Sequence, residues 1–237
     1  MKFLSYNIQA GIGTRGTADY IFKAHHQFID TARKRKTLRN IGKLLRGYDI
    51  VCLQEVDLGG RRAGYKSQVD YLSEIAGLPH IAHQTNRIVG RSSRHGNAIL
   101  SRFPIEDIGD HKLPSRIPGR GKLICKIEDL TIINTHLSLR DKVQAEQLDF
   151  VGGFIGKQDR IIMSGDLNCR ASAPHLETFA DSQNLNIITG QHTLTYPSWS
   201  PRRDLDHILV SQALGPVKAK VLDVTFSDHL PVAANLD

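Results

Sequence analysis

The sequence of 237 residues has few cysteines and no long hydrophobic run, and each shortage excludes a class of protein. The three cysteines, Cys52, Cys125 and Cys169, are odd in number and lack CxxC spacing, which argues against a disulfide framework or a zinc site. No window approaches about eighteen consecutive apolar residues, and the start MKFLSYNIQAG lacks the apolar stretch of a signal peptide. We therefore expect a cytoplasmic protein without a transmembrane segment.

Acidic residues are also in short supply. The 24 Asp and Glu against 31 Lys and Arg give a net charge of +7. This balance favours a polyanionic partner, such as nucleic acid, a phosphorylated metabolite or an anionic lipid surface, although a positive charge that serves only solubility explains it equally well. A composition of 40% hydrophobic and 23% charged residues is typical of globular chains, and this length supports a core without metal or disulfides. Any bound metal would therefore have a catalytic role and not a structural one.

Apolar periodicity predicts a mixed α and β fold. Helical patterns place Leu38, Ile41 and Leu45 on one face, followed by similar patterns over residues 69–76, 143–155 and 176–180. Short β-branched or apolar runs that predict strands lie between them, at residues 2–8, 49–56, 97–101, 122–127, 130–137, 160–164, 207–210 and 217–224.

The order of these elements repeats once along the chain. A strand ending at Asn7, a helix and a strand ending at Glu55 are echoed by a strand ending at His136, a helix and a strand ending at Asp166. Each half then continues with another strand that carries a polar residue. This repetition predicts two similar layers packed face to face, with the polar residues gathered at one edge.

Polar side chains at the ends of apolar strands are candidates for a shared cleft, because burying an unpaired carboxylate costs several kcal/mol. One such residue is usually a cap or turn residue, but a whole set of one chemical type is harder to dismiss. The set is rich in carboxylate and amide oxygens and lacks a cysteine partner, which favours a hard divalent ion, Mg²⁺ or Mn²⁺. With histidines and a basic surface, it predicts hydrolysis of a phosphate ester. The set is Glu55, His136, Asp166, Asn168, Asp206, His207, Asp228 and His229.

Seven short motifs in order resemble the endonuclease/exonuclease/phosphatase superfamily over nearly the whole chain. They are SYN at residues 5–7, LQEVD at 53–57, GNAILSR at 96–102, NTHL at 134–137, GDLN at 165–168, LDHI at 205–208 and SDHLPV at 227–232. The resemblance implies a four-layer α/β sandwich with two stacked mixed β-sheets flanked by helices. It also implies a single domain over residues 1–237, which we expect to act as a monomer.

Carried over residue by residue, the resemblance implies a role for each polar side chain. Glu55 would be the main magnesium ligand, supported by Asn7, and Asp228 would be a second carboxylate of the metal site. His229 would be the general base, hydrogen-bonded to Asp206. The remaining three residues would contact the reacting phosphate: Asp166 and Asn168 would hold the attacking water and a phosphoryl oxygen, and His136 would donate to the oxyanion or leaving group.

Substrate contacts are expected from other positions. Asn97 would either hydrogen-bond within the phosphate site or serve only as the first residue of a strand. Trp199 would either stack on a base or sugar of the substrate or pack its loop against the fold. Arg94 belongs to a basic group flanking LQEVD and GNAILSR, some of which we expect to face the substrate. The other members of this group are Arg61, Arg62, Arg87, Arg91, Arg116, Arg120 and Lys122.

Two further segments have alternative readings. The basic run at residues 33–39 predicts a solvated helix face or a substrate guide, and residues 11–30, with His25 and His26, could form a flap over the site.

The substrate could be nucleic acid, a phospholipid or inositol-type head group, or a sugar phosphate. Abasic-site endonucleases carry other motifs at the places of LQEVD, NTHL and LDHI, which argues against a function in DNA repair. The alternative to an enzyme is a catalytically silent nucleic-acid-binding module on the same fold.

Overall fold

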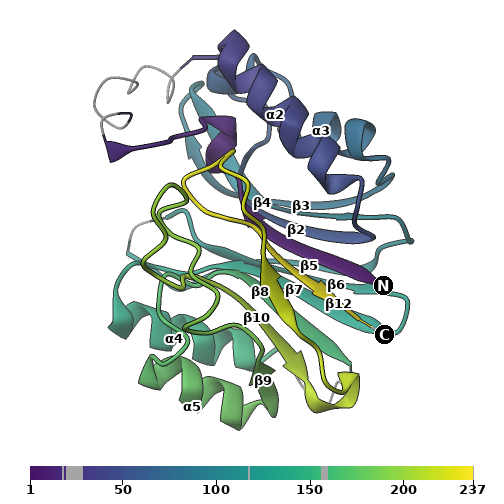
Figure 1. The fold of residues 1–237 in the computed structure, drawn as a ribbon, viewed down its shortest axis with the longest axis vertical. Coiled ribbons are helices and arrows are strands. Elements are labelled where there is room, and N and C mark those ends of the chain that lie inside the picture. Colours follow the sequence, from purple (N-terminus) through teal and green to yellow (C-terminus); the bar gives the residue numbers. More distant parts are fainter. Residues whose placement is uncertain (18, 20–28, 117, 156–159, 237) are drawn as a thin grey trace.

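Two six-stranded β-sheets lie at the centre of the structure, with helices on the outer face of each (Figure 1). This is the four-layer α/β sandwich that the motifs predicted. The computed structural model describes residues 1–17, 19, 29–116, 118–155 and 160–236. Most of the flap expected at residues 11–30, including His25 and His26, lies outside the described residues.

The two sheets contain the twelve strands in two separate sets. The first sheet has the order β11-β12-β1-β2-β4-β3, and the second has the order β5-β6-β7-β8-β10-β9. The first comprises β1 (Lys2–Asn7), β2 (Ile50–Asp57), β3 (His80–Val89), β4 (Ser93–Ser101), β11 (Ala219–Val221) and β12 (Val232–Asn235). The second comprises β5 (Glu106–Lys112), β6 (Gly121–Ile127), β7 (Leu130–His136), β8 (Ile161–Asp166), β9 (Leu185–Ile187) and β10 (Asp206–Ser211).

Helices cover the outer faces, as the apolar patterns predicted. Figure 1 shows α2 and α3 over the first sheet, and α4 and α5 over the second. Thr31 caps α2 by accepting a hydrogen bond from the backbone N–H of Lys34, and Ser67 caps α3 in the same way. The helices with described bounds are α2 (Ala32–Leu45), α3 (Gln68–Ala76), α4 (Asp141–Gly152) and α5 (Pro174–Ser182), and short 3₁₀ turns lie at Gln9–Gly11, Arg61–Ala63 and Gln212–Leu214.

The internal repeat predicted from the sequence is visible in the strand order. The series β12-β1-β2-β4-β3 matches β6-β7-β8-β10-β9 position by position, including the parallel pairs β1/β2 and β7/β8. A helix connects the parallel strands in each half, α2 in the first and α4 in the second. The C-terminal ends of β1, β2, β7 and β8 therefore occupy equivalent places.

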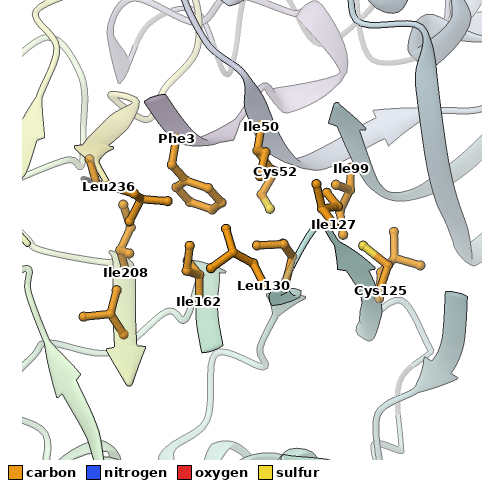
Figure 2. Close-up of a cluster of buried hydrophobic side chains, with 14 of the residues drawn as sticks. Phe3, Ile50, Cys52, Ile99, Cys125, Ile127, Leu130, Ile162, Ile208 and Leu236 are labelled. Carbon is orange, nitrogen blue, oxygen red and sulfur yellow. The ribbon is translucent and has the colours of Figure 1, made fainter. Parts of the chain in front are cut away.

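An apolar core joins the two sheets (Figure 2). Phe3 and Cys52 from the first sheet pack toward Ile132 and Ile162 from the second, and all four are fully buried. Complete burial of one such large side chain stabilises the fold by about 1.5–3 kcal/mol. Burial raises the pKa of the Cys52 thiol, which keeps it protonated, and all three cysteines are free and buried.

Hydrogen bonds replace apolar packing where the strand ends meet. Gln54 Nε2 donates to Asn134 Oδ1 at 2.8 Å, and Asn134 Nδ2 donates to the carbonyl oxygens of Leu53 at 3.0 Å and Ala98 at 2.8 Å. Asn134 comes from the second sheet and its three partners from the first. This set of contacts fixes how the two sheets are placed relative to each other beside the polar strand ends.

The sequence missed four strands, β3, β5, β9 and β12, while every strand and helix it predicted is present. In the described part of the chain, no helix is long and apolar enough to cross a membrane.

Candidate active site

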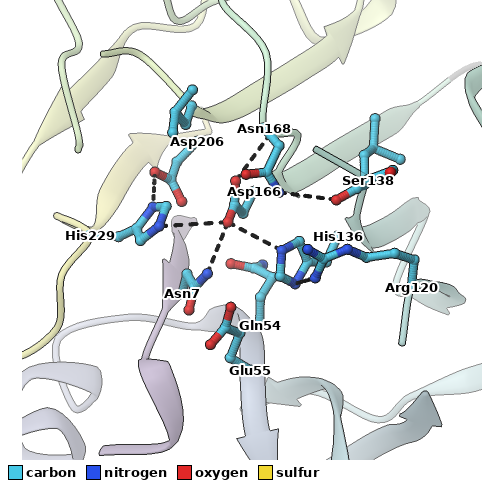
Figure 3. A network of polar contacts seen from close by, with 12 residues as sticks. Asn7, Gln54, Glu55, Arg120, His136, Ser138, Asp166, Asn168, Asp206 and His229 are labelled. Atoms are coloured by element: carbon cyan, nitrogen blue, oxygen red, sulfur yellow. Dashed lines mark hydrogen bonds and ion pairs between the residues drawn. The ribbon is translucent and has the colours of Figure 1, made fainter. Parts of the chain in front are cut away.

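Asp166 is the centre of the cluster of polar strand ends (Figure 3). It closes β8 with its side chain 2% exposed, and its Oδ2 accepts a hydrogen bond from Asn7 Nδ2 at 2.9 Å. The same oxygen lies 3.3 Å from His136 Nε2 and 3.7 Å from His229 Nε2. One carboxylate oxygen therefore faces three of the predicted residues, from both sheets.

His229 forms a short hydrogen bond with Asp206 on the side of its ring away from Asp166. The His229 Nδ1 to Asp206 Oδ2 distance is 2.8 Å, and both side chains are buried. Asp206 opens β10 directly opposite Asp166 in the ladder, so the two carboxylates lie on neighbouring strands. Burial disfavours the imidazolium, but the charges of Asp206 and Asp166 outweigh burial and raise the pKa of His229 well above its ordinary value.

Arg120 determines the tautomer of His136. Its Nη1 lies 3.1 Å from His136 Nδ1, and a guanidinium can only donate, so Nδ1 is the acceptor. The ring proton therefore resides on Nε2, the atom that faces Asp166. Burial and the Arg120 charge lower the pKa of His136, so this histidine donates as a neutral imidazole.

The GDLN motif forms a strained turn that positions Asp166. Gly165 has φ +148°, and a Cβ at this position would lie 1.8 Å from the carbonyl oxygen of Thr135, so only glycine fits here. Asn168 has φ +55° and donates from its backbone N–H to Asp166 Oδ1 at 3.1 Å, while its Nδ2 donates to Leu137 O at 3.0 Å. The motif therefore fixes the rotamer of Asp166.

Glu55 lies at a bulge in β2 with φ +57°, an uncommon conformation for a residue with a side chain. Its carboxylate is 30% exposed, and its Oε2 lies 3.9 Å from His95 Nε2. Burial raises the pKa of Glu55, but the neighbouring histidines, His95 first, together lower it below its ordinary value and keep the carboxylate ionised. Figure 3 shows Glu55 beneath Asn7.

The donor set fits a hard divalent ion. Carboxylates and amides dominate it, and Asp206 Oδ1 and Gln54 Oε1 are buried without a hydrogen-bond partner in the described part of the chain. Ligand atoms of Asp166, Asp206 and His229 also lie within 4.8 Å of one another, but His229 Nδ1 and Asp206 Oδ2 are already hydrogen-bonded to each other. Acceptors left in this state are costly unless a cation or water satisfies them.

Asp228 lies next to His229 in sequence and is held by other residues. Its Oδ2 accepts from Gln9 Nε2 at 2.9 Å, and its Oδ1 accepts from Ser227 Oγ at 3.1 Å. Its role as a second metal-site carboxylate stays a prediction.

The three predicted substrate contacts are scattered around the site. Asn97 is fully buried, and its Nδ2 donates to Gly121 O at 3.1 Å, which links the two sheets. Arg94 is exposed on β4, and Trp199 is half-buried in the loop before β10. Their contacts with substrate stay predictions.

Other basic residues of the predicted group have structural roles. Arg62 forms a buried ion pair with Asp57, and Lys122 is buried under the ring of Phe154. In the run at residues 33–39, Lys34 is buried, donates to carbonyl groups and has a pKa lowered to about 8, first by burial. Neither pure solvation nor a substrate guide describes Lys34.

Several residues in and around the site were assigned no role from the sequence. His95 lies beside Glu55, Gln54 binds Asn134, and the Tyr196 ring centroid lies 4.9 Å from that of His229. Gln54 and Asn134 stand inside the motifs LQEVD and NTHL, so their amide chemistry was a signal that could have identified them.

Comparison with known proteins assigns the chain to a family. The endonuclease/exonuclease/phosphatase family matches residues 4–229, and its members are phosphoester hydrolases. The chain belongs to this family.

Three relatives illustrate the match. The uncharacterized protein YbhP of Escherichia coli K12 is 27% identical over 211 residues, which cover 79% of this chain and 83% of YbhP. A phospholipase C of Staphylococcus aureus is 25% identical over 194 residues, 59% of each chain. The solved structure of a Staphylococcus aureus beta toxin mutant with bound magnesium ions has a TM-score of 0.72 at 18% identity, and the match covers 100% of this chain and 99% of the toxin.

Proposed function

We propose that this protein is a phosphodiesterase that depends on Mg²⁺ or Mn²⁺ and uses His229 to activate the attacking water. The observation that carries the proposal is the buried series Asp206, His229 and Asp166, in which one carboxylate binds Nδ1 and the other faces Nε2. This arrangement is suited to a general base whose tautomer is fixed.

In the proposed reaction, His229 Nε2 accepts the proton of the water. Asp206 holds the proton on Nδ1 and stabilises the imidazolium that forms, and the hydrogen bond between the two side chains supports this role. Asp166 and Asn168 orient the water and a phosphoryl oxygen. Neutral His136, held in one tautomer by Arg120, donates from Nε2 to the oxygen on which negative charge develops.

Glu55 and Asn7 would hold the divalent ion, with Asp228 as a second carboxylate. Asn7 Oδ1 accepts one hydrogen bond from the backbone of Gln9, at 3.1 Å, which leaves a second lone pair for a cation. When bound, the ion supplies charge neutralisation and polarises a phosphoryl oxygen. The magnesium in the beta toxin structure supports this choice of metal.

The substrate is a phosphate diester, in nucleic acid or in a phospholipid or inositol-type head group. The name of the Staphylococcus aureus relative, phospholipase C, supports a diester. We infer further that the chain acts as a single domain and a monomer in the cytoplasm, with Asn97, Arg94 and Trp199 contributing substrate contacts.

The test is hydrolysis of single-stranded DNA, duplex DNA, RNA, phospholipids, inositol phosphates and bis(p-nitrophenyl) phosphate with Mg²⁺ and then Mn²⁺. Activity should be abolished by EDTA, and Glu55→Ala and His229→Ala should each lower kcat/KM by several orders of magnitude. The exposed residues Glu74 and His83, changed to alanine, are the matched controls. Activity that resists EDTA, full activity in both site variants, or nucleic-acid binding without hydrolysis of any substrate would overturn the proposal.

A further inference from the structure

A basic pocket of about 820 Å³ lies beside the candidate active site. Its volume is within the range of about 300–1,000 Å³ that is usual for small-molecule sites. The charge of the lining is strongly positive, because five cationic side chains accompany a single carboxylate. The cationic residues are Arg87, Arg116, Arg120, Arg140 and Lys142, and the carboxylate is Glu146.

Two lining residues connect this pocket with the reacting centre. Arg120 donates to His136 at 3.1 Å, and His95 lies 3.9 Å from Glu55. A phosphate held between Glu55 and His136 would therefore lie next to the basic pocket.

The cations of the pocket are available to a ligand. Within the described ranges, no carboxylate lies within ion-pair distance of Arg87, Arg116, Arg140 or Lys142, unlike Arg62 and Arg102, which pair with aspartates. Guanidinium groups bind phosphate oxygens in a bidentate manner. The described lining contains no Phe, Tyr or Trp, so it lacks the ring faces on which a quaternary ammonium group binds.

We propose that this pocket is a subsite for a second phosphate, so that the preferred substrate carries another phosphate group within a few bonds of the one that is cleaved. The inference rests on the proposed function, and it excludes a cationic head group as the preferred leaving or retained part. Arg87, Arg116, Arg140 and Lys142 select the substrate, while Arg120 serves both the subsite and His136.

The test compares diesters that differ only in a neighbouring phosphate. The thymidine dinucleotides TpT and pTpT form one pair, and glycerophosphoinositol with and without a ring phosphate forms the other. In the wild type, the extra phosphate should raise kcat/KM about tenfold or more at low salt, and the gain should shrink as ionic strength rises. A gain in one pair identifies the source of the phosphate, and a gain in both shows that the phosphate group itself is recognised.

The double variant Arg87→Gln/Arg140→Gln should bring the ratio between the two members of a pair close to one. Lys36→Gln/Arg39→Gln, an equal change of charge at exposed positions of α2, should leave the ratio as in the wild type. Equal kcat/KM within both pairs, or an unchanged ratio in the pocket variant, would overturn the subsite while leaving the hydrolase proposal standing.

Binding of pTpT and TpT to the His229→Ala variant separates the two proposals. Calorimetric titration should show tighter binding of pTpT, and this preference should disappear when Arg87→Gln/Arg140→Gln is added. If the wild type hydrolyses nothing, the hydrolase proposal fails and this titration still decides the subsite. Equal affinities for the two dinucleotides would refute it.

Discussion

Asp206→Asn is the sharpest test of the candidate base. The change keeps size and shape but removes the charge that binds His229 Nδ1 at 2.8 Å in a buried environment. A charge-assisted hydrogen bond of this kind contributes about 1.5–3 kcal/mol, which corresponds to a loss of roughly 10- to 150-fold in rate when it stabilises the imidazolium. The asparagine amide can also donate to Nδ1, which would move the ring proton to Nε2 and remove the acceptor.

Together the two effects predict a fall in kcat/KM of about 10²–10⁴-fold. The pKa of His229 is raised in the wild type, and protonation abolishes a base, so activity declines as pH falls through that raised pKa. Without the Asp206 charge, the pKa falls and the acidic limb moves to lower pH. The relative loss of activity should therefore be smallest at the acidic end.

The measurement is kcat/KM for bis(p-nitrophenyl) phosphate between about pH 5 and 9 at saturating Mg²⁺. Asp70→Asn, an exposed change on α3, is the control, and the melting temperature of each variant shows whether it is folded. Wild-type rates with an unmoved acidic limb in Asp206→Asn would show that Asp206 and His229 are not a catalytic pair.

Three further outcomes are expected. Glu55→Gln should lower kcat/KM about 10²-fold or more and raise the Mg²⁺ concentration needed for half-maximal activity, and an unchanged metal titration would contradict its role. Arg120→Gln should raise the pKa of His136 and lower kcat/KM about tenfold or more, because the Arg120 charge and its control of the His136 tautomer are lost. Circular dichroism shows whether this variant is folded. An unaltered pH profile would count against this reasoning. Gly165→Ala should lower the free energy of unfolding by about 3 kcal/mol or more in a urea titration, because the new Cβ would meet Thr135 O, and a change below 1 kcal/mol would show that this strand pair adapts.

The sequence predicted eight of the strands and missed β3 and β5, which lack an apolar run, together with the short strands β9 and β12. Each predicted strand contains residues that pack into a core, whereas β5 has no fully buried residue. In β3, two inward-facing side chains are the amides Gln84 and Asn86, so alternation of burial is present without alternation of hydrophobicity. Only the partner sheet makes these positions interior.

The candidate site was predictable as a group because the ends of equivalent strands meet at one edge. Its internal order was not predictable. That Asp166 faces three residues at once, and that Arg120 sets the His136 tautomer, depends on how closely the two sheets approach. The pattern of one strand contains no information on this distance.

Activity depends on the position of one sheet relative to the other, and the side-chain amide of Asn134 holds that position. The hydrophobic effect that holds the core between the sheets is non-directional, while the three hydrogen bonds of Asn134 are directional. Asn7 and Asp166 come from opposite sheets, and a displacement of about 1 Å is enough to cost a reaction about 10²-fold. We therefore expect warming to abolish activity through a small displacement of one sheet relative to the other, at temperatures where the strands and helices are still intact.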